Sequence, residues 1–279
     1  MARAPALDIE LLPGAPRLLE LHARELPQRD DLCGAFCGAL ALGAAGFDER
    51  AGEPLDQDAV AVAAGSFISA TPQPDILPQG ETGRRDYRLA IPRIADGEES
   101  GTTAAGVLDA VAALADGELT TIPYAGPWTS ATLTGMFDAA AACERPVTLI
   151  ANLATHHLWG SRASIPGLLG YLLDGDGEGP APDWRVGHFV CVVGRVRGPG
   201  GTLYVLTDTY PSLGSRGVHM QPQEHLARAL ERSDMPAGGV IAVAFAGDAD
   251  ALRAAAAATG LTEGIWDNGT VAAEGKSRP

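Results

Sequence analysis

Residues 33–45, with the sequence CGAFCGALALGAA, have no polar face and constrain the fold of this chain more than any other segment. Their composition predicts a helix, with Asp30 or Asp31 available as its N-cap and Gly46 as its C-cap. A helix that is apolar all round must be covered on every side. The chain is therefore expected to wrap its other elements around this one.

Helical periodicity predicts further helices at residues 16–26, 56–64, 102–115, 130–143 and 248–258. Runs of β-branched residues bounded by Gly and Pro predict strands at residues 146–153, 188–194, 202–208 and 239–245. Because the helices precede the strands instead of alternating with them, the pattern favours an α+β fold. In such a fold a helical half with a central buried helix packs against an antiparallel β-sheet half.

The length of 279 residues suits a single domain, residues 1–279, with a long loop insertion at about residues 66–101. This insertion is rich in Pro, Gly and charge, and loops of that length are lids, binding loops or disordered segments. Residues 267–279 are polar and are expected to form a flexible tail.

The charge balance limits the partners. With 20 Lys and Arg against 35 Asp and Glu, the net charge of −15 leaves no basic stripe, so we expect no nucleic acid and no membrane surface as a partner. Residues 1–10 lack the apolar core of a secretory signal, and no run reaches the ~18 apolar residues of a membrane span. These features predict a cytoplasmic protein of undetermined oligomeric state.

Four cysteines, Cys33, Cys37, Cys143 and Cys191, are expected to be free thiols in a reducing compartment, and their spacing fits no structural zinc site. Cys33 opens the apolar helix. A thiol at a helix N-terminus meets unpaired backbone N–H groups and the positive end of the dipole, which favour the reactive thiolate. The amide of Gln28, a few residues earlier, could join those N–H groups in stabilising an oxyanion.

His188 opens a predicted strand and Asp208 ends the next one. If a hairpin joins the two strands, Asp208 can orient the His188 imidazole so that it takes the proton of the thiol. Each residue also has an ordinary structural interpretation, since buried cysteines are common and an Asp at a strand end is often a turn former. Cys37, one helical turn after Cys33, is the alternative nucleophile.

Three stretches carry a resemblance to a known family: QRDDLCGAFCGALAL, VGHFVCVVG and LYVLTDTYPS. They resemble the motifs of papain-like cysteine hydrolases, in particular bacteriocin-processing double-glycine peptidases and phytochelatin synthases. The resemblance implies a papain-like fold with Cys33 as nucleophile, His188 as general base and acid, Asp208 as orienting residue and Gln28 as oxyanion donor.

The resemblance further implies a cysteine peptidase or amidohydrolase that cleaves an amide through an acyl-enzyme, without cofactor or metal. The substrate would be a peptide or a small amide or thioester. An amide-forming acyltransferase and a catalytically silent binding module remain the alternatives. A metal site at His156 and His157 is not expected, because neighbouring side chains should point apart and no carboxylate lies nearby in the sequence.

Overall fold

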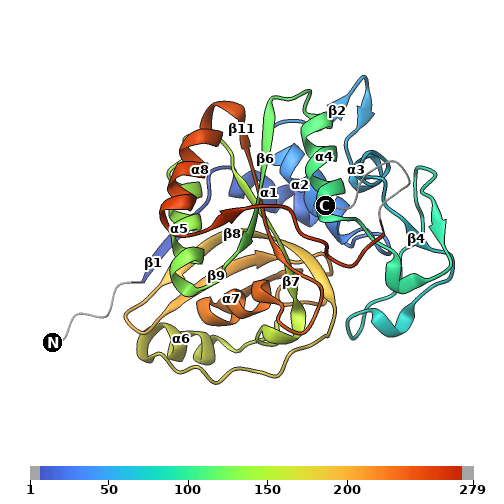
Figure 1. The fold of residues 1–279 in the computed structure, drawn as a ribbon. Coiled ribbons are helices and arrows are strands. Elements are labelled where there is room, and N and C mark those ends of the chain that lie inside the picture. Colours follow the sequence, from blue (N-terminus) through green and yellow to red (C-terminus); the bar gives the residue numbers. More distant parts are fainter. Residues whose placement is uncertain (1–6, 272–279) are drawn as a thin grey trace.

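The computed structural model describes residues 7–271 and contains one large antiparallel sheet with helices on both sides (Figure 1). The strand order is β10-β9-β8-β7-β11-β6-β12, and β1 pairs with the far end of β8. The strands are β1 (Asp8–Leu11), β6 (Leu119–Gly126), β7 (Thr148–Ala154), β8 (Gly187–Arg197), β9 (Thr202–Thr207), β10 (Val218–Pro222), β11 (Gly239–Phe245) and β12 (Thr262–Glu263).

The described residues form eight α-helices: α1 (Ala15–Glu25), α2 (Cys33–Ala44), α3 (Gln57–Ala64), α4 (Ala104–Leu114), α5 (Ser130–Ala141), α6 (Ile165–Asp174), α7 (Gln223–Glu231) and α8 (Ala249–Ala258). The α+β class is therefore confirmed. Helices and strands interleave more than the sequence pattern predicts, because β6 lies between α4 and α5 and α6 precedes β8.

Helix α2 is the central element, as its apolar sequence requires. It packs against α1, α3 and α4 and against strands β7 and β8. Two of its glycines allow this close approach: a Cβ at Gly34 would lie 3.2 Å from the Phe189 ring, and one at Gly38 would lie 2.9 Å from Val60. Larger residues at these positions would push α2 away from the sheet or from α3.

Strand β7 is buried along its whole length and β8 along almost all of it. Such strands must be covered on both faces. Helix α2 contacts β7 and β8, and α7 contacts β7, β9 and β10. Figure 1 shows α1–α4 grouped on one side of the sheet and α7 on the other. The start of β8, which carries His188, thus lies beside the N-terminus of α2.

The insertion at residues 66–101 is a loop that contains only short elements. These are a parallel pair, β4 (Ile68–Ser69) with β5 (Arg93–Ile94), and two 3₁₀ turns, Pro74–Ile76 and Gly97–Glu99. A two-stranded hairpin, β2 (Glu49–Arg50) with β3 (Glu53–Pro54), precedes it.

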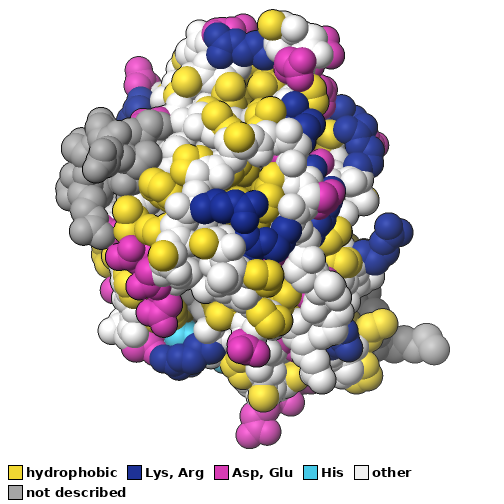
Figure 2. Space-filling model, turned by 90° about the vertical axis from the view of Figure 1, so that its right-hand side faces the viewer, with side chains coloured by type: hydrophobic (Ala, Val, Ile, Leu, Met, Phe, Trp, Pro, Cys, Tyr) yellow, Lys and Arg dark blue, Asp and Glu magenta, His cyan; other side chains and the backbone are white. Residues whose placement is uncertain are grey.

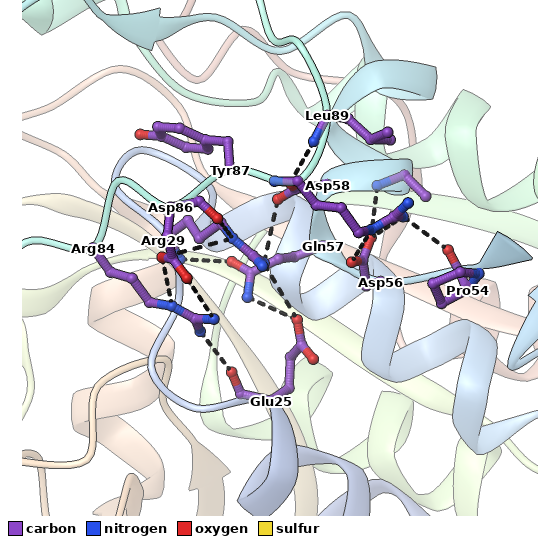
Figure 3. Close-up of polar contacts among 12 residues, drawn as sticks. Glu25, Arg29, Pro54, Asp56, Gln57, Asp58, Arg84, Asp86, Tyr87 and Leu89 are labelled. Atoms are coloured by element: carbon purple, nitrogen blue, oxygen red, sulfur yellow. Dashed lines mark hydrogen bonds and ion pairs between the residues drawn. The ribbon is translucent and has the colours of Figure 1, made fainter.

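A polar cluster ties this loop to the helices (Figure 3). The Arg29 guanidinium donates to the backbone oxygen of Asp86 at 3.0 Å and pairs with the fully buried Asp58 at 3.3 Å. Asp58 also accepts the backbone N–H groups of Arg88 and Leu89. The loop is therefore held against the segment that leads into α2.

The chain end described by the structure crosses the same region. Asn268 accepts the backbone N–H of Ala104 and donates to the backbone oxygen of Thr102. Of the predicted tail, residues 272–279 lie outside the described residues. Within residues 7–271, no helix combines the length and the hydropathy needed to cross a membrane.

Candidate active site

Cys33 is the first residue of α2, at the end of the helix that faces the start of β8. The N-cap position belongs to Leu32, and no side chain caps the helix. The predicted cap by Asp30 or Asp31 is wrong, because Asp30 accepts the N–H of Arg84 at 2.8 Å and Asp31 that of Ser69 at 2.7 Å. Both carboxylates bind N–H groups of the insertion, so the first N–H groups of α2 have no side-chain partner and can bind an anion.

A cavity of about 470 Å³ lies at this end of α2 and brings the predicted site residues together. Gln28, Cys33 and His188 line it, and residues of the insertion form part of its wall. Cys33 contributes to raising the pKa of the His188 ring. His188 is buried, whereas Cys33 is partly exposed to the cavity.

Asp208 lies directly behind His188. Its Oδ1 accepts from Nε2 of His188 at 3.0 Å and from the backbone N–H of Thr209 at 2.7 Å. Since Nε2 faces Asp208, Nδ1 is the ring nitrogen left for the thiol. The hairpin between β8 and β9, which turns at Gly198–Gly201, places both residues at the same end of the sheet.

The pair is electrostatically coupled. Burial alone would lower the pKa of His188, but the charge and hydrogen bond of Asp208, with a smaller contribution from Cys33, raise the pKa to about 10. Burial alone would raise the pKa of the Asp208 carboxyl, yet His188 and then His219 hold that pKa well below its usual range. The geometry favours an imidazolium facing the thiol.

A second histidine, which the sequence analysis missed, supports Asp208 from the other side. Nε2 of His219 lies 3.3 Å from Oδ2 of Asp208. Gln221 determines the tautomer of His219. The Oε1 atom of Gln221 accepts the backbone N–H of Trp159, so its other side-chain atom is the amide nitrogen. This Nε2 donates to the backbone oxygen of Trp159 and to Nδ1 of His219. Nδ1 therefore accepts, so Nε2 carries the proton and donates to the carboxylate.

The sequence feature that could have indicated His219 and Gln221 is their spacing of two residues on β10. The register pairs His219 with Leu206, two residues before Asp208, and alternate residues of a strand share one face.

Aromatic rings shield the His188–Asp208 pair from water. The ring centroid of Trp184 lies 4.8 Å from that of His188 in an edge-to-face arrangement, and Tyr210 stacks on the imidazole at 6.4 Å. The indole N–H of Trp184 donates to the backbone oxygen of Ile76 at 2.7 Å. The insertion therefore holds the ring that covers the histidine, and a shielded ion pair is stronger than one in water.

Gln28 is buried and lines the same cavity as Cys33. Its backbone N–H donates to the oxygen of Thr209 at 3.0 Å, which fixes it next to the end of β9. Its side chain lines the cavity, and Oε1 has no hydrogen-bond partner among the described residues. An amide held in this way is free to bind a group that enters the cavity.

Cys37, the alternative nucleophile, lies one turn deeper in α2 with 1 % of its surface exposed. Burial, reinforced by a hydrogen bond with Cys191, raises the pKa of its thiol well above the usual value. Cys37 does not line the cavity. All four cysteines are free thiols, and only Cys33 among them reaches the cavity.

The expectation that His156 and His157 point apart, with no carboxylate to complete a ligand set, is wrong. Both lie on a 3₁₀ turn, and their Nε2 atoms contact the two oxygens of Asp234 at 2.9 and 3.1 Å. The ligand atoms of these three residues lie within 4.8 Å of one another. Arg185 also donates to Asp234 at 3.0 Å, so a cation already neutralises this carboxylate.

The comparisons with known proteins add a family. The model of a family of unknown function, DUF6885, matches residues 12–267. The chain belongs to this family. The match spans α2, the insertion, His188 on β8 and Asp208 directly after β9, so the whole candidate site lies within the family's extent. No curated protein matches the chain.

Proposed function

We propose that this protein is a thiol-dependent acyl enzyme, a cysteine peptidase or amidohydrolase, that cleaves an amide bond through a Cys33–His188–Asp208 triad. The observation that carries the proposal is that Cys33, at the N-terminus of α2, and His188, which pairs with Asp208 at 3.0 Å, line one cavity large enough for a substrate. Cavities of a few hundred Å³ are typical of small-molecule and peptide sites.

In the proposed reaction, Nδ1 of His188 accepts the proton of the thiol, and the Cys33 sulfur attacks the carbonyl carbon. The oxyanion of the tetrahedral intermediate accepts from the uncapped N–H groups of α2 and from the amide of Gln28. His188 then gives its proton to the leaving amine, which departs and leaves an acyl-enzyme. A water molecule, deprotonated by His188, hydrolyses the thioester and restores the thiol.

Asp208 acts on this reaction through His188. Its carboxylate stabilises the imidazolium that pairs with the thiolate, and the hydrogen bond at Nε2 fixes the ring orientation. His219 and the N–H of Thr209 hold the carboxylate in place, so the pair is preorganised before any substrate binds.

The papain-like relationship belongs to the same proposal. A buried helix carries the thiol at its N-terminus, and of two adjacent antiparallel strands one carries the histidine and the other ends directly before the aspartate. This arrangement and the three motif stretches support the resemblance independently of each other. The family of unknown function would then be a branch of that superfamily in which the insertion builds part of the substrate cleft.

The experiment that tests the proposal uses p-nitrophenyl acetate as an activated acyl donor. We expect a burst of p-nitrophenolate of one equivalent per chain and acetylation of Cys33 identified by peptide mass spectrometry. Cys33→Ala should abolish the burst, whereas the matched variant Cys37→Ala should retain it. Adding a primary amine distinguishes the two reactions, because hydrolysis releases acetate whereas acyl transfer produces the N-acetylated amine.

A wild-type protein that shows no burst, or a Cys33→Ala variant that keeps it, contradicts the proposal. The first result would leave a binding module with an enzyme-like site, and the second would move the reactive group to another residue.

A further inference from the structure

Arg232 is a buried cation in the wall of the same cavity. It follows α7 in a left-handed backbone conformation, with φ of 47°, and only 3 % of its surface is exposed. One guanidinium nitrogen, Nη1, donates to Oδ1 of Asn152 at 2.6 Å. Nε is buried and has no hydrogen-bond partner among the described residues.

Two glycines leave the space that the side chain occupies. A Cβ at Gly187 would lie 2.6 Å from Nη2 of Arg232, and a Cβ at Gly238 would lie 2.4 Å from its Cδ. Gly187 immediately precedes His188, so the guanidinium lies against the strand segment that carries the proposed general base. The surrounding residues therefore hold the guanidinium of Arg232 in a defined position.

No carboxylate among the described residues forms an ion pair with Arg232. Asp234, two residues away, is engaged by His156, His157 and Arg185. Burial lowers the pKa of Arg232 to about 10 against the smaller opposing effects of Cys33 and Asp234, so the side chain remains charged at neutral pH. A buried charge with no carboxylate within ion-pair distance is costly, and a ligand of opposite charge would offset that cost.

Arg232 differs in this respect from the two other arginines that line the cavity. Arg85 pairs with Asp30 at 3.8 Å and donates to the backbone oxygen of Ser69. The side chain of Arg185 is 65 % exposed and pairs with Asp234. Although the chain is acidic, the face that carries the insertion shows basic side chains at its centre and acidic ones mostly nearer its edge (Figure 2).

We propose that Arg232 binds a carboxylate of the acyl substrate, so that the enzyme acts on amides with an anionic group close to the reacting carbonyl. A guanidinium suits this task because its fork of N–H groups matches the two carboxylate oxygens. The inference rests on the proposed function, since it names the substrate class of the same site. The carboxylate is either the terminus of a peptide or an acidic side chain.

The test compares two alkylating reagents of the same size, iodoacetate, which carries a carboxylate, and iodoacetamide, which does not. In Arg232→Met, the ratio of the iodoacetate rate to the iodoacetamide rate at Cys33 should fall about tenfold or more, because one charge-assisted contact is lost. Arg232→Lys keeps the charge but not the forked N–H groups, so its rate ratio should lie between those of the wild type and Arg232→Met. The matched control Arg185→Met should leave the ratio within about twofold of wild type.

An unchanged ratio in Arg232→Met overturns the inference. An equal loss with both reagents also overturns it, because Arg232 would then act on the thiolate and not on the substrate. If wild-type Cys33 shows no selective reaction with iodoacetamide, the proposed function fails instead.

Calorimetry on the Cys33→Ala protein tests the carboxylate site without the thiol. N-acetylglycylglycine carries a terminal carboxylate, N-acetylaspartic acid α-amide carries only a side-chain carboxylate, and N-acetylglycylglycinamide carries none. We expect one of the two anions to bind about tenfold or more tightly than the neutral amide, and the anion preferred identifies the source of the carboxylate. Equal affinities of all three ligands, or a preference that survives Arg232→Met, contradicts the inference.

Discussion

Replacing Asp208 by Asn tests the ion pair behind the proposed triad. The carboxylate is buried and accepts three hydrogen bonds, from His188, His219 and the N–H of Thr209. An amide of the same size has only one oxygen, so it leaves at least one donor unsatisfied and removes the charge that stabilises the imidazolium. Breaking a buried ion pair costs about 3–5 kcal/mol, and we expect a loss of that size in the free energy of unfolding near pH 6.

The loss should depend on pH in a direction that the pKa of His188 determines. This pKa is raised from 6.5 in the unfolded chain to about 10 in the folded protein. Its contribution to stability is therefore complete below pH 6.5 and disappears as the pH rises toward 10, with a limiting slope of about 1.4 kcal/mol per pH unit. The pKa of Asp208 is lowered on folding, so its contribution is present above about pH 4 and is lost in acid.

The assay is urea unfolding of the wild type and Asp208→Asn at intervals from pH 5 to pH 10. Both proteins should carry Cys33→Ala, so that the comparison reports on the His188–Asp208 pair without the thiol. We expect the difference between them to be largest at pH 5–6 and to shrink steadily above pH 6.5. A difference that stays constant across this range would show that His188 is not held as an imidazolium by Asp208, and the electrostatic reasoning would be refuted.

Three further changes test the supports of the site. His219→Leu leaves Oδ2 of Asp208 without its side-chain donor, so the pKa of that carboxyl should rise and acid unfolding should begin at a higher pH. An unshifted acid transition would show that His219 only fills space. Gly38→Ala places a Cβ 2.9 Å from Val60 and should lower the free energy of unfolding by about 1–3 kcal/mol. The control is Gly177→Ala, where the added Cβ meets no neighbour within 4 Å, and equal melting temperatures of the two variants would contradict the packing of α2. Arg29→Met leaves Asp58 as an uncompensated buried charge, which should lower the free energy of unfolding by about 3–5 kcal/mol. Residues 84–89 should then become accessible to trypsin, and unchanged cleavage would show that the cluster does not hold the insertion in place.

Much of the fold could be predicted because apolar periodicity reports burial directly. The sequence of α2 has no polar face, and the helix is indeed buried on all sides. The residues that the motifs single out, Cys33, His188 and Gln28, line one cavity, and Asp208 contacts His188. Local pattern was sufficient there because each residue lies at the end of a well-defined element.

What could not be predicted depends on contacts between distant segments. Asp30 and Asp31 have the sequence of helix caps, yet they bind N–H groups of the insertion more than thirty residues away. His219 reaches Asp208 only through the register of β10 on β9. Arg232 has the appearance of a surface residue at the end of an amphipathic helix, and only the tertiary fold shows it buried beside His188.

The central claim is that His188 activates Cys33, and the rate of iodoacetamide alkylation, with the modified peptide identified by mass spectrometry, tests it most directly. We predict that Cys33 reacts ahead of Cys37, Cys143 and Cys191. His188→Ala should slow its reaction at pH 6 by at least about tenfold, because the imidazolium that favours the reactive thiolate is lost. Alkylation spread over several cysteines, or an unchanged rate at Cys33 in His188→Ala, would contradict the account.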